Sequence, residues 1–264
     1  MASSPRLWPN PPGNSPLPLP TGPVLFSSRE LTELNYPKMP DCEKLDLDGL
    51  RDYVGSFTLD DGRLVSEVID LQKRRPLLVA GELANPYRLC DIMAPDMPII
   101  PVRLEHICRT WADNLDGRDI QPGIHHVTVV RSPGWWEKSY ITLLELPDMK
   151  KIVQWLDGSN PNTWVPKRLA EGVIRLEDDM SITSPSLEQI SWDGVEEKVD
   201  VEIPRSNGPA LDLSSIMVPI NTRSGCYNSR GRVNRCVHFP QTDFHDKMFR
   251  RGSSFKWSDM LDYL

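Results

Sequence analysis

Cysteine is scarce in this sequence, and its pattern excludes a fold built on disulfides. The 264 residues contain five cysteines: Cys42, Cys90, Cys108, Cys226 and Cys236. An odd number without closely spaced pairs does not match the paired frameworks of small secreted domains. No Asn-x-Ser/Thr glycosylation acceptor with a permitted middle residue occurs either. We therefore expect the chain to be nuclear or cytoplasmic, in a reducing compartment, and not secreted.

Long apolar runs are also absent. No stretch approaches the roughly 18 consecutive apolar residues that a membrane-spanning helix needs. Residues 1–23 carry prolines where a signal peptide has its apolar region. The sequence therefore predicts no membrane partner and no secretory signal.

The motifs of the common enzyme classes are missing as well. Glycine-rich phosphate loops, dinucleotide fingerprints, zinc-protease helices and nucleophile elbows do not occur. Residues 46–49 (Asp-Leu-Asp-Gly) lack the spacing and the late glutamate of an EF-hand loop. His125 and His126 lie in a strand-like run, where adjacent side chains point to opposite faces. The sequence thus predicts a protein that is not an enzyme and holds no cofactor, and an active site without a recognisable motif is the alternative.

The composition combines an acidic balance with signs of both order and disorder. The chain has 30 Lys and Arg against 37 Asp and Glu, a formal net charge of -7. Any nucleic-acid contact must therefore come from a local basic patch. The 25 prolines and the mean hydropathy of -0.39 indicate that part of the chain is unpacked. Eight tryptophans indicate an ordered core elsewhere.

Four regions follow from these shifts in composition. Residues 1–40 are rich in proline, which favours an extended, disordered arm. Residues 41–204 predict a globular domain, and residues 205–234 a flexible linker. Residues 235–264 predict a basic segment that ends in an amphipathic helix.

Within the central region, apolar alternation and turn residues predict an α+β fold, mostly antiparallel β with one or two helices between disordered tails. A helix is expected over 102–115, because Leu104, Ile107, Trp111 and Leu115 recur at helical spacing. Strands are expected at 53–59, 64–71, 124–130, 139–146, 151–156, 163–165 and 172–176.

A basic interval and a group of metal-binding residue types overlap near the C-terminus. The candidate nucleic-acid contacts are Arg230, Arg232, Arg235, Arg250 and Arg251, and DNA is the expected partner. The candidate zinc ligands are Cys226, Cys236, His238 and His245. Their spacing matches no standard zinc finger, so we expect no bound metal. Residues 235–239 (Arg-Cys-Val-His-Phe) also fit the basic-x-Val-x-Phe pattern that docks on protein phosphatase-1.

The last residues carry the sharpest local pattern. Trp257, Met260, Leu261 and Leu264 fall at i, i+3, i+4 and i+7, which makes one apolar stripe on a helix. Ser254 could cap the start of that helix, and Phe255 would extend its apolar surface. Mixed aromatic and acidic residues in a terminal segment are typical of motifs that fold on a transcriptional co-activator. A terminal helix that packs on its own domain is the alternative.

The order of the parts resembles that of the foamy-virus transactivator (Tas) family, with a folded middle, a basic segment and a C-terminal activator. The local similarities are Ser139-Tyr140, Trp155, Trp164-Val165, the run 167–172 and Arg235-Cys236. They cover about a fifth of the chain, and the basic segment is thinner and the cysteines fewer than in the family. The resemblance implies a nuclear, DNA-binding activator of viral promoters.

These observations predict a regulatory protein, a nuclear transcriptional activator that contacts DNA and recruits a protein partner through its C-terminus. Two alternatives come from other classes. One is a viral structural or assembly protein whose tails tether it to its neighbours, and the other is a phosphatase-1-docking regulatory subunit.

Overall fold

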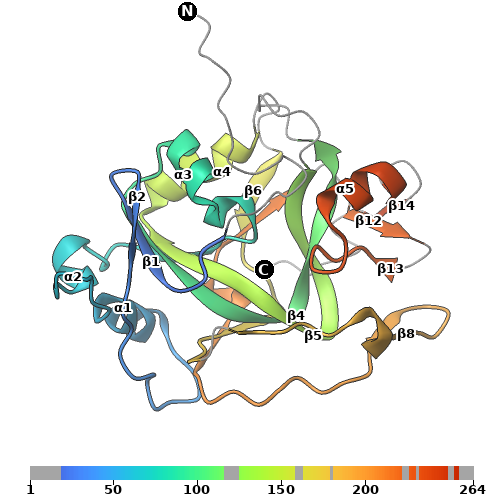
Figure 1. The fold of residues 1–264 in the computed structure, drawn as a ribbon, viewed down its shortest axis with the longest axis horizontal. Coiled ribbons are helices and arrows are strands. Elements are labelled where there is room, and N and C mark those ends of the chain that lie inside the picture. Colours follow the sequence, from blue (N-terminus) through green and yellow to red (C-terminus); the bar gives the residue numbers. More distant parts are fainter. Residues whose placement is uncertain are drawn as a thin grey trace, which may run out of the picture.

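The computed structural model describes residues 19–115, 125–157, 163–178, 181–221, 226–229, 232–248 and 253–255. The described residues form an α+β fold in which antiparallel strands dominate (Figure 1). This confirms the predicted fold class. None of the helices in these ranges is long and apolar enough to cross a membrane.

A long hairpin is the centre of the fold. Strand β4 (Met97–Leu115) pairs in antiparallel register with β5 (His125–Leu144), from Ile99 opposite Thr142 to Leu115 opposite His125. The register shifts between residues 105 and 107, where His106 has a positive φ of 66°. This bulge bends the hairpin.

The helix predicted over 102–115 is therefore wrong, because these residues belong to β4. Nearly every side chain from Pro101 to Ala112 is buried, since both faces of the strand are covered. A strand covered on both faces shows no simple alternation, and the bulge shifts what alternation remains. Leu104, Ile107 and Trp111 thus reach helical spacing by coincidence.

Other strands extend the sheet on both sides of the hairpin. β3 (Arg75–Leu78) pairs with β5. The outer edge of β4 is shared, with β1 at residues 97–99 and β7 at residues 103–105. The strands beyond this edge are β1 (Val24–Ser27), β2 (Glu30–Glu33), β7 (Val173–Arg175) and β10 (Ala210–Asp212). The smaller pairs are β6 (Trp164–Lys167) with β11 (Val218–Asn221), and β8 (Ile190–Trp192) with β9 (Glu197–Val199).

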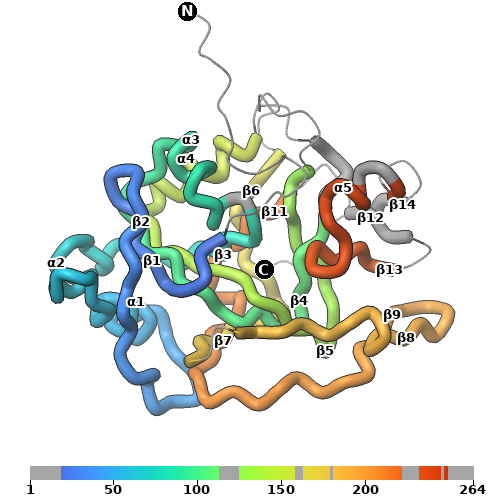
Figure 2. The backbone as a smooth tube through the Cα atoms, in the orientation of Figure 1, coloured from blue at the N-terminus to red at the C-terminus, as the bar shows by residue number. Residues whose placement is uncertain are grey.

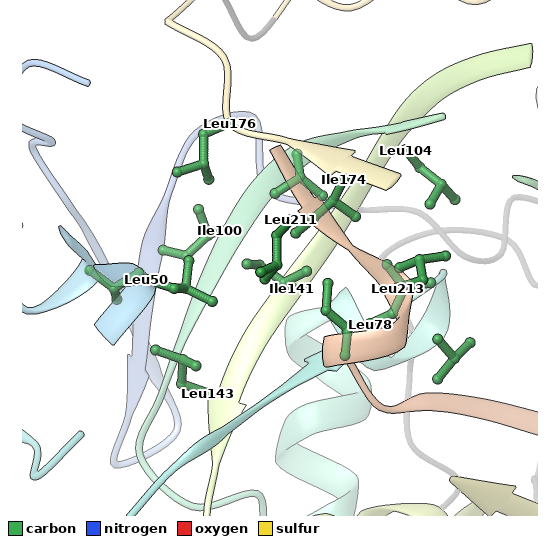
Figure 3. Close-up of a cluster of buried hydrophobic side chains, with 14 of the residues drawn as sticks. Leu50, Leu78, Ile100, Leu104, Ile141, Leu143, Ile174, Leu176, Leu211 and Leu213 are labelled. Atoms are coloured by element: carbon green, nitrogen blue, oxygen red, sulfur yellow. The ribbon is translucent and has the colours of Figure 1, made fainter. Parts of the chain in front are cut away.

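Alternate residues of the sheet feed two separate hydrophobic clusters. Leu78, Ile100 and Ile141 lie in the larger cluster with Leu211 and other side chains that Figure 3 labels. Their chain neighbours Leu77, Ile99 and Tyr140 lie in the second cluster, on the opposite face, because strand side chains alternate. The second cluster is covered by α3 and α4 (Figure 1).

The helices begin where the sequence offers caps. Asp46 accepts a hydrogen bond from the Gly49 N–H at the start of α1 (Leu47–Gly55), and Asn85 caps α3 (Pro86–Ile92). The remaining α-helices are α2 (Val65–Val68), α4 (Leu146–Asp157) and α5 (Gln241–Asp243), which a π-helical turn (Phe244–Met248) follows. Short 3-10 turns are η2 (Glu82–Ala84), η3 (Leu187–Gln189) and η4 (Leu213–Ser215).

Three predicted strands are corrected by these helices. Residues 53–59 overlap α1, residues 64–71 contain α2, and residues 151–156 lie in α4. In α4 the buried side chains fall at positions 149, 152, 153 and 156, which is helical spacing that the short window 151–156 conceals. The strands predicted at 163–165 and 172–176 are present, with ends shifted by one or two residues. The strands predicted at 124–130 and 139–146 are parts of one strand, because residues 125–144 form β5 without a break.

Two predicted region boundaries are also wrong. The segment of residues 1–40, which the sequence predicts to be disordered, contains β1 and β2, and Phe26 is only 1% exposed. The linker assigned to residues 205–234 contains β10 and β11, where Ile220 is fully buried. Both segments bury apolar side chains against distant strands, which local composition does not show. Residues 1–18 and 256–264 lie outside the described residues.

Gly172 lies where the backbone approaches core side chains closely, which makes it the first mutational test. It has a φ of 88°, and a Cβ atom there would lie 2.5 Å from Ile107 Cγ1 and 2.7 Å from Leu213 Cδ1. Gly172→Ala should lower the free energy of unfolding by about 2–4 kcal/mol, from backbone strain and overpacking together. Urea denaturation measures this. The matched control is Gly194→Ala, with a φ of 103° and open space around it, which should cost only about 1–2 kcal/mol. Equal losses would contradict the packing.

Candidate functional site

All site residues predicted from the sequence fall after residue 225, and the structure places several of them against the β4–β5 hairpin. We call residues 232–239 the C-terminal strap. Strand β13 (Arg232–Val233) opens it, and its backbone then crosses the outer edge of β4. The Cys236 N–H donates to the Arg109 carbonyl at 3.0 Å, and the Thr110 hydroxyl donates to the Asn234 carbonyl at 2.8 Å. The strap thus continues the shared edge of β4 beyond β7.

The Arg235 side chain anchors the strap in a pocket. Its guanidinium lies 4.6 Å from the centroid of the Trp135 ring, and Nη2 donates to Ser132 Oγ at 2.8 Å. Nη1 lies 2.8 Å from Glu197 Oε2 on β9. Arg235 is 2% exposed. We call Trp135, Ser132 and Glu197 the arginine pocket.

A second buried ion pair lies next to the strap. Glu137 Oε1 accepts hydrogen bonds from the Arg109 backbone N–H at 2.6 Å and from Arg109 Nε at 3.0 Å. Glu137 is fully buried. Burial raises the pKa of the Glu137 carboxyl, and the adjacent Arg109 guanidinium opposes that rise. The Glu137 carboxylate therefore accepts the backbone N–H of Arg109, just beyond the bulge, which a neighbouring strand would otherwise bind.

The arm formed by residues 181–209 holds the strap from its other side. It runs past the bend of the hairpin and carries β8 and β9 (Figure 2). Trp136 Nε1 donates to the Thr183 carbonyl at 2.7 Å, and His238 Nε2 lies 2.8 Å from the Pro185 carbonyl. Since a carbonyl can only accept, Nε2 carries the proton in neutral His238. Burial lowers the pKa of this imidazole.

The cysteines of this region are shielded. Cys108 is fully buried beside the arginine pocket, with Ser132 in hydrogen-bonding reach and Arg235 and Glu197 nearby. Burial raises the pKa of the Cys108 thiol to about 12. Burial also raises the pKa of the Cys236 thiol. Both thiols are therefore protonated and poor nucleophiles in this arrangement.

The basic residues predicted to contact nucleic acid divide into three groups. Arg235 is buried and ion-paired, so its assignment as a nucleic-acid contact is wrong for this conformation. Arg232 is exposed on β13 and remains available to a phosphate. Arg230, Arg250 and Arg251 lie outside the described residues. The sequence could not separate Arg232 from Arg235, because charge density says nothing about which side chain a pocket receives.

The candidate zinc ligands are only partly described. Cys236 packs beside Trp111 and Phe244, and His238 is bound to the arm. The side chains of Cys226 and His245 lie outside the described residues. Among the described side chains, no three of His, Cys, Asp or Glu gather as metal ligands would. The absence of zinc stays a prediction.

The terminal apolar stripe is also only partly described. Residues 253–255 form β14 (Ser253–Phe255), which pairs with β12 (Cys226–Ser229). The expectation that Ser254 caps a helix is therefore wrong, because the residue lies in a strand. Phe255 is opposite Cys226 in this pairing. Trp257, Met260, Leu261 and Leu264 lie outside the described residues.

The phosphatase-docking pattern does not have the conformation that docking needs. The N–H groups of His238 and Phe239 both donate to the Arg235 carbonyl, so residues 235–239 form a turn. Extended binding would place Val237 and Phe239 on one face of a strand. Here Val237 is 40% exposed, and the Phe239 carbonyl accepts from Trp111 Nε1.

Sequence reasoning missed the residues that build the arginine pocket and the Arg109–Glu137 ion pair. Trp135 and Glu137 follow Pro133-Gly134, a turn dipeptide between two predicted strands. A carboxylate directly after two tryptophans in an apolar run was the available signal. Glu197 gave no such signal, because it lies among several acidic residues and only the fold brings it to Arg235. Comparisons with protein-family models, curated proteins and solved structures find no match to this chain.

The Arg235 ion pair should dominate the stability of this region. Arg235→Gln leaves Glu197 buried without its cation, so the free energy of unfolding should fall by about 3–5 kcal/mol. Urea denaturation of the full chain measures the loss. The matched control is Arg131→Gln, since Arg131 pairs with Glu171 at 2.6 Å but its side chain is 39% exposed. That exposed pair should contribute at most about 1 kcal/mol. A loss for Arg235→Gln no larger than the control's would contradict the pocket.

His238 should make stability depend on pH. Its folded pKa lies below the ordinary value of 6.5, so the unfolded chain takes up this proton first as pH falls. Stability from this group is therefore complete above pH 6.5 and decreases as pH falls through 6.5 towards the folded pKa. His238→Gln keeps a donor for the Pro185 carbonyl and removes the titration. Unfolding free energies measured from pH 8 to pH 5.5 should fall more steeply for the unmodified protein than for the variant. Parallel curves would contradict a shifted His238.

Proposed function

We propose that this chain is a non-enzymatic regulatory protein, a nuclear transcriptional activator whose C-terminus recruits a protein partner. The position of β14 carries the proposal. β14 pairs with β12, and Cys226 of β12 pairs with Ala112 of β4. β14 is therefore joined to the central sheet through β12, and the terminal segment follows β14 directly in the sequence. A segment that starts from an ordered strand is well placed to present itself to a partner.

The composition of that segment supports recruitment. Trp257 and Leu261 lie on the apolar stripe, and Asp259 and Asp262 lie off it. Such a segment pays part of its ordering cost when it folds into the groove of a co-activator. With residues 253–255 in β14, the helix can begin only after Phe255.

DNA contact in this proposal rests on the basic residues outside the pocket. Arg232 is exposed, and Arg230, Arg250 and Arg251 are close to it or to β14 in the sequence. Arginine contacts to phosphates give affinity that falls with salt and does not depend on base sequence. Base-specific recognition would have to come from the β-rich domain.

An assembly protein is the second candidate, and one observation favours it. The arm exposes two large apolar side chains, Val195 at 85% and Leu187 at 53%. Exposed apolar side chains on a hairpin suit contacts between subunits. An assembly protein should associate as its concentration rises, which sedimentation of the full chain measures, whereas the activator needs no self-association.

The activator proposal is tested by transfer of the terminal segment. Residues 249–264 fused to a heterologous DNA-binding domain should activate a reporter gene. Trp257→Ala combined with Leu261→Ala should abolish that activity, because each anchor contributes on the order of 2 kcal/mol in a groove. Ser258→Ala, off the stripe, is the matched control and should retain activity.

The packing alternative predicts the reverse pattern. The isolated segment would be inactive, and the double variant of the full chain would lose thermal stability. That combination would refute recruitment by the terminal stripe.

A further inference from the structure

The C-terminal strap combines a deep anchor with an incompletely satisfied interface. Arg235 makes two polar contacts in the arginine pocket, and the strap backbone adds three hydrogen bonds to β4. Against these, three buried polar atoms of the strap find no hydrogen-bond partner among the described residues: Asn234 Nδ2, Arg235 Nε and His238 Nδ1. Each such atom loses its hydrogen bonds to water without a replacement. These atoms offset part of the stability that the other contacts of the docked strap contribute.

The strap is also a local unit of the structure. Its backbone is hydrogen-bonded to β4 at residues 109, 110 and 111, and β13 pairs with β12 at two positions, whereas β4 and β5 pair along thirteen positions. After the strap, Phe244 of the π-helical turn is buried against Trp111 and Val127, and this contact persists when Cys236 of the strap leaves the same cluster. The strap can therefore leave the sheet while the hairpin and α5 stay in place. Local opening of this kind is typical of segments with few ladder bonds.

When the strap opens, it exposes side chains that are hidden in the docked state. Arg235 is buried, and the turn at 235–239 keeps Val237 and Phe239 from sharing one face. An undocked, extended strap would present an arginine followed by two apolar side chains on one face. That is the form in which extended peptides enter apolar grooves of partner proteins.

We propose that the C-terminal strap undocks from β4 and the arginine pocket while the rest of the domain stays folded, and that undocking presents Arg235, Val237 and Phe239 to the groove of a protein partner. The strap is then a cis ligand that masks its own docking sequence. Undocking does not depend on whether the terminal stripe activates transcription.

Cys108 reports the event directly. Its thiol is fully buried beside Arg235 and Glu197, so it is protected while the strap is docked. In our proposal, withdrawal of Arg235 from the pocket exposes this thiol, which then reacts as an ordinary cysteine.

The experiment is native-state labelling of the full chain with N-ethylmaleimide over a series of urea concentrations below the unfolding transition. Mass spectrometry of the digested protein gives the labelling rate of Cys108. We expect Cys108 to react at least ten times faster than global unfolding allows, with a urea dependence less than a third as steep. A rate and a urea slope equal to those of global unfolding would overturn the proposal.

Two matched variants connect the opening to the pocket. Glu197→Gln weakens the Arg235 anchor and should accelerate Cys108 labelling at least ten-fold, beyond any change in the global unfolding rate. Glu171→Gln weakens the exposed Arg131 pair and should leave the Cys108 rate unchanged. Acceleration by both variants alike, or acceleration by Glu197→Gln that only matches its loss of global stability, would also overturn the proposal.

Binding of a synthetic peptide tests whether a partner protein recognises the strap. A peptide of residues 232–241, which contains Arg235, Val237 and Phe239, should bind the catalytic subunit of protein phosphatase-1. This subunit supplies the apolar groove for the test. The full chain should bind it at least ten times more weakly, and Glu197→Gln should recover part of the difference. Equal binding by peptide and full chain would show that the strap masks nothing. A peptide that does not bind would refute the choice of docking sequence.

Discussion

The fold depends on satisfying the backbone of one long strand. β4 has 19 residues, and most of its described side chains are buried. A buried strand must find partners for its N–H and C=O groups on both edges, since an unpaired buried group costs about as much as a lost hydrogen bond. β5 serves one edge from Ile99 to Leu115, with register shifts at the bulge and between residues 111 and 115. The other edge is served in turn by β1, β7, the strap and β12. This requirement joins residues near position 24 and residues near position 235 in one domain.

Between β7 and the strap, a carboxylate binds the outer edge of β4 in place of a strand. Glu137 accepts the Arg109 N–H directly after the bulge and neutralises the Arg109 side chain. Arg235 and Glu197 form a second buried pair, at the place where the strap crosses β4 next to Thr110. Buried pairs of this kind contribute little net stability, because desolvation offsets their attraction, but losing one partner is costly. We infer that they fix the position of the strap more than they strengthen the fold.

This arrangement changes how the basic C-terminal interval should be understood. Arg235 serves the interior, whereas Arg232 faces solvent three residues earlier. The arginines of this interval therefore have at least two roles, since one forms a buried ion pair and another is exposed to solvent. In the sequence, the strap lies between β12 and β14, two strands that pair with each other.

By itself, the sequence determined the fold class and several strands, because alternating apolar residues near turn residues require little context. Val127, Val129 and Ile141 are β-branched residues in strand-like runs, and they lie in β5 as their local pattern indicates. The sequence also determined which residue types were available near the C-terminus.

Only the tertiary structure decided the rest. It made a strand of residues 102–115, because burial on both faces removes the alternation that identifies a strand. It ordered residues 24–33 and 210–221, because their partners are distant in the chain. It placed Arg235 against Glu197 and Trp135, and no local pattern connects positions 135, 197 and 235. Local propensity reports on near neighbours, whereas edge pairing and charge burial are settled by segments that meet only after the chain has folded.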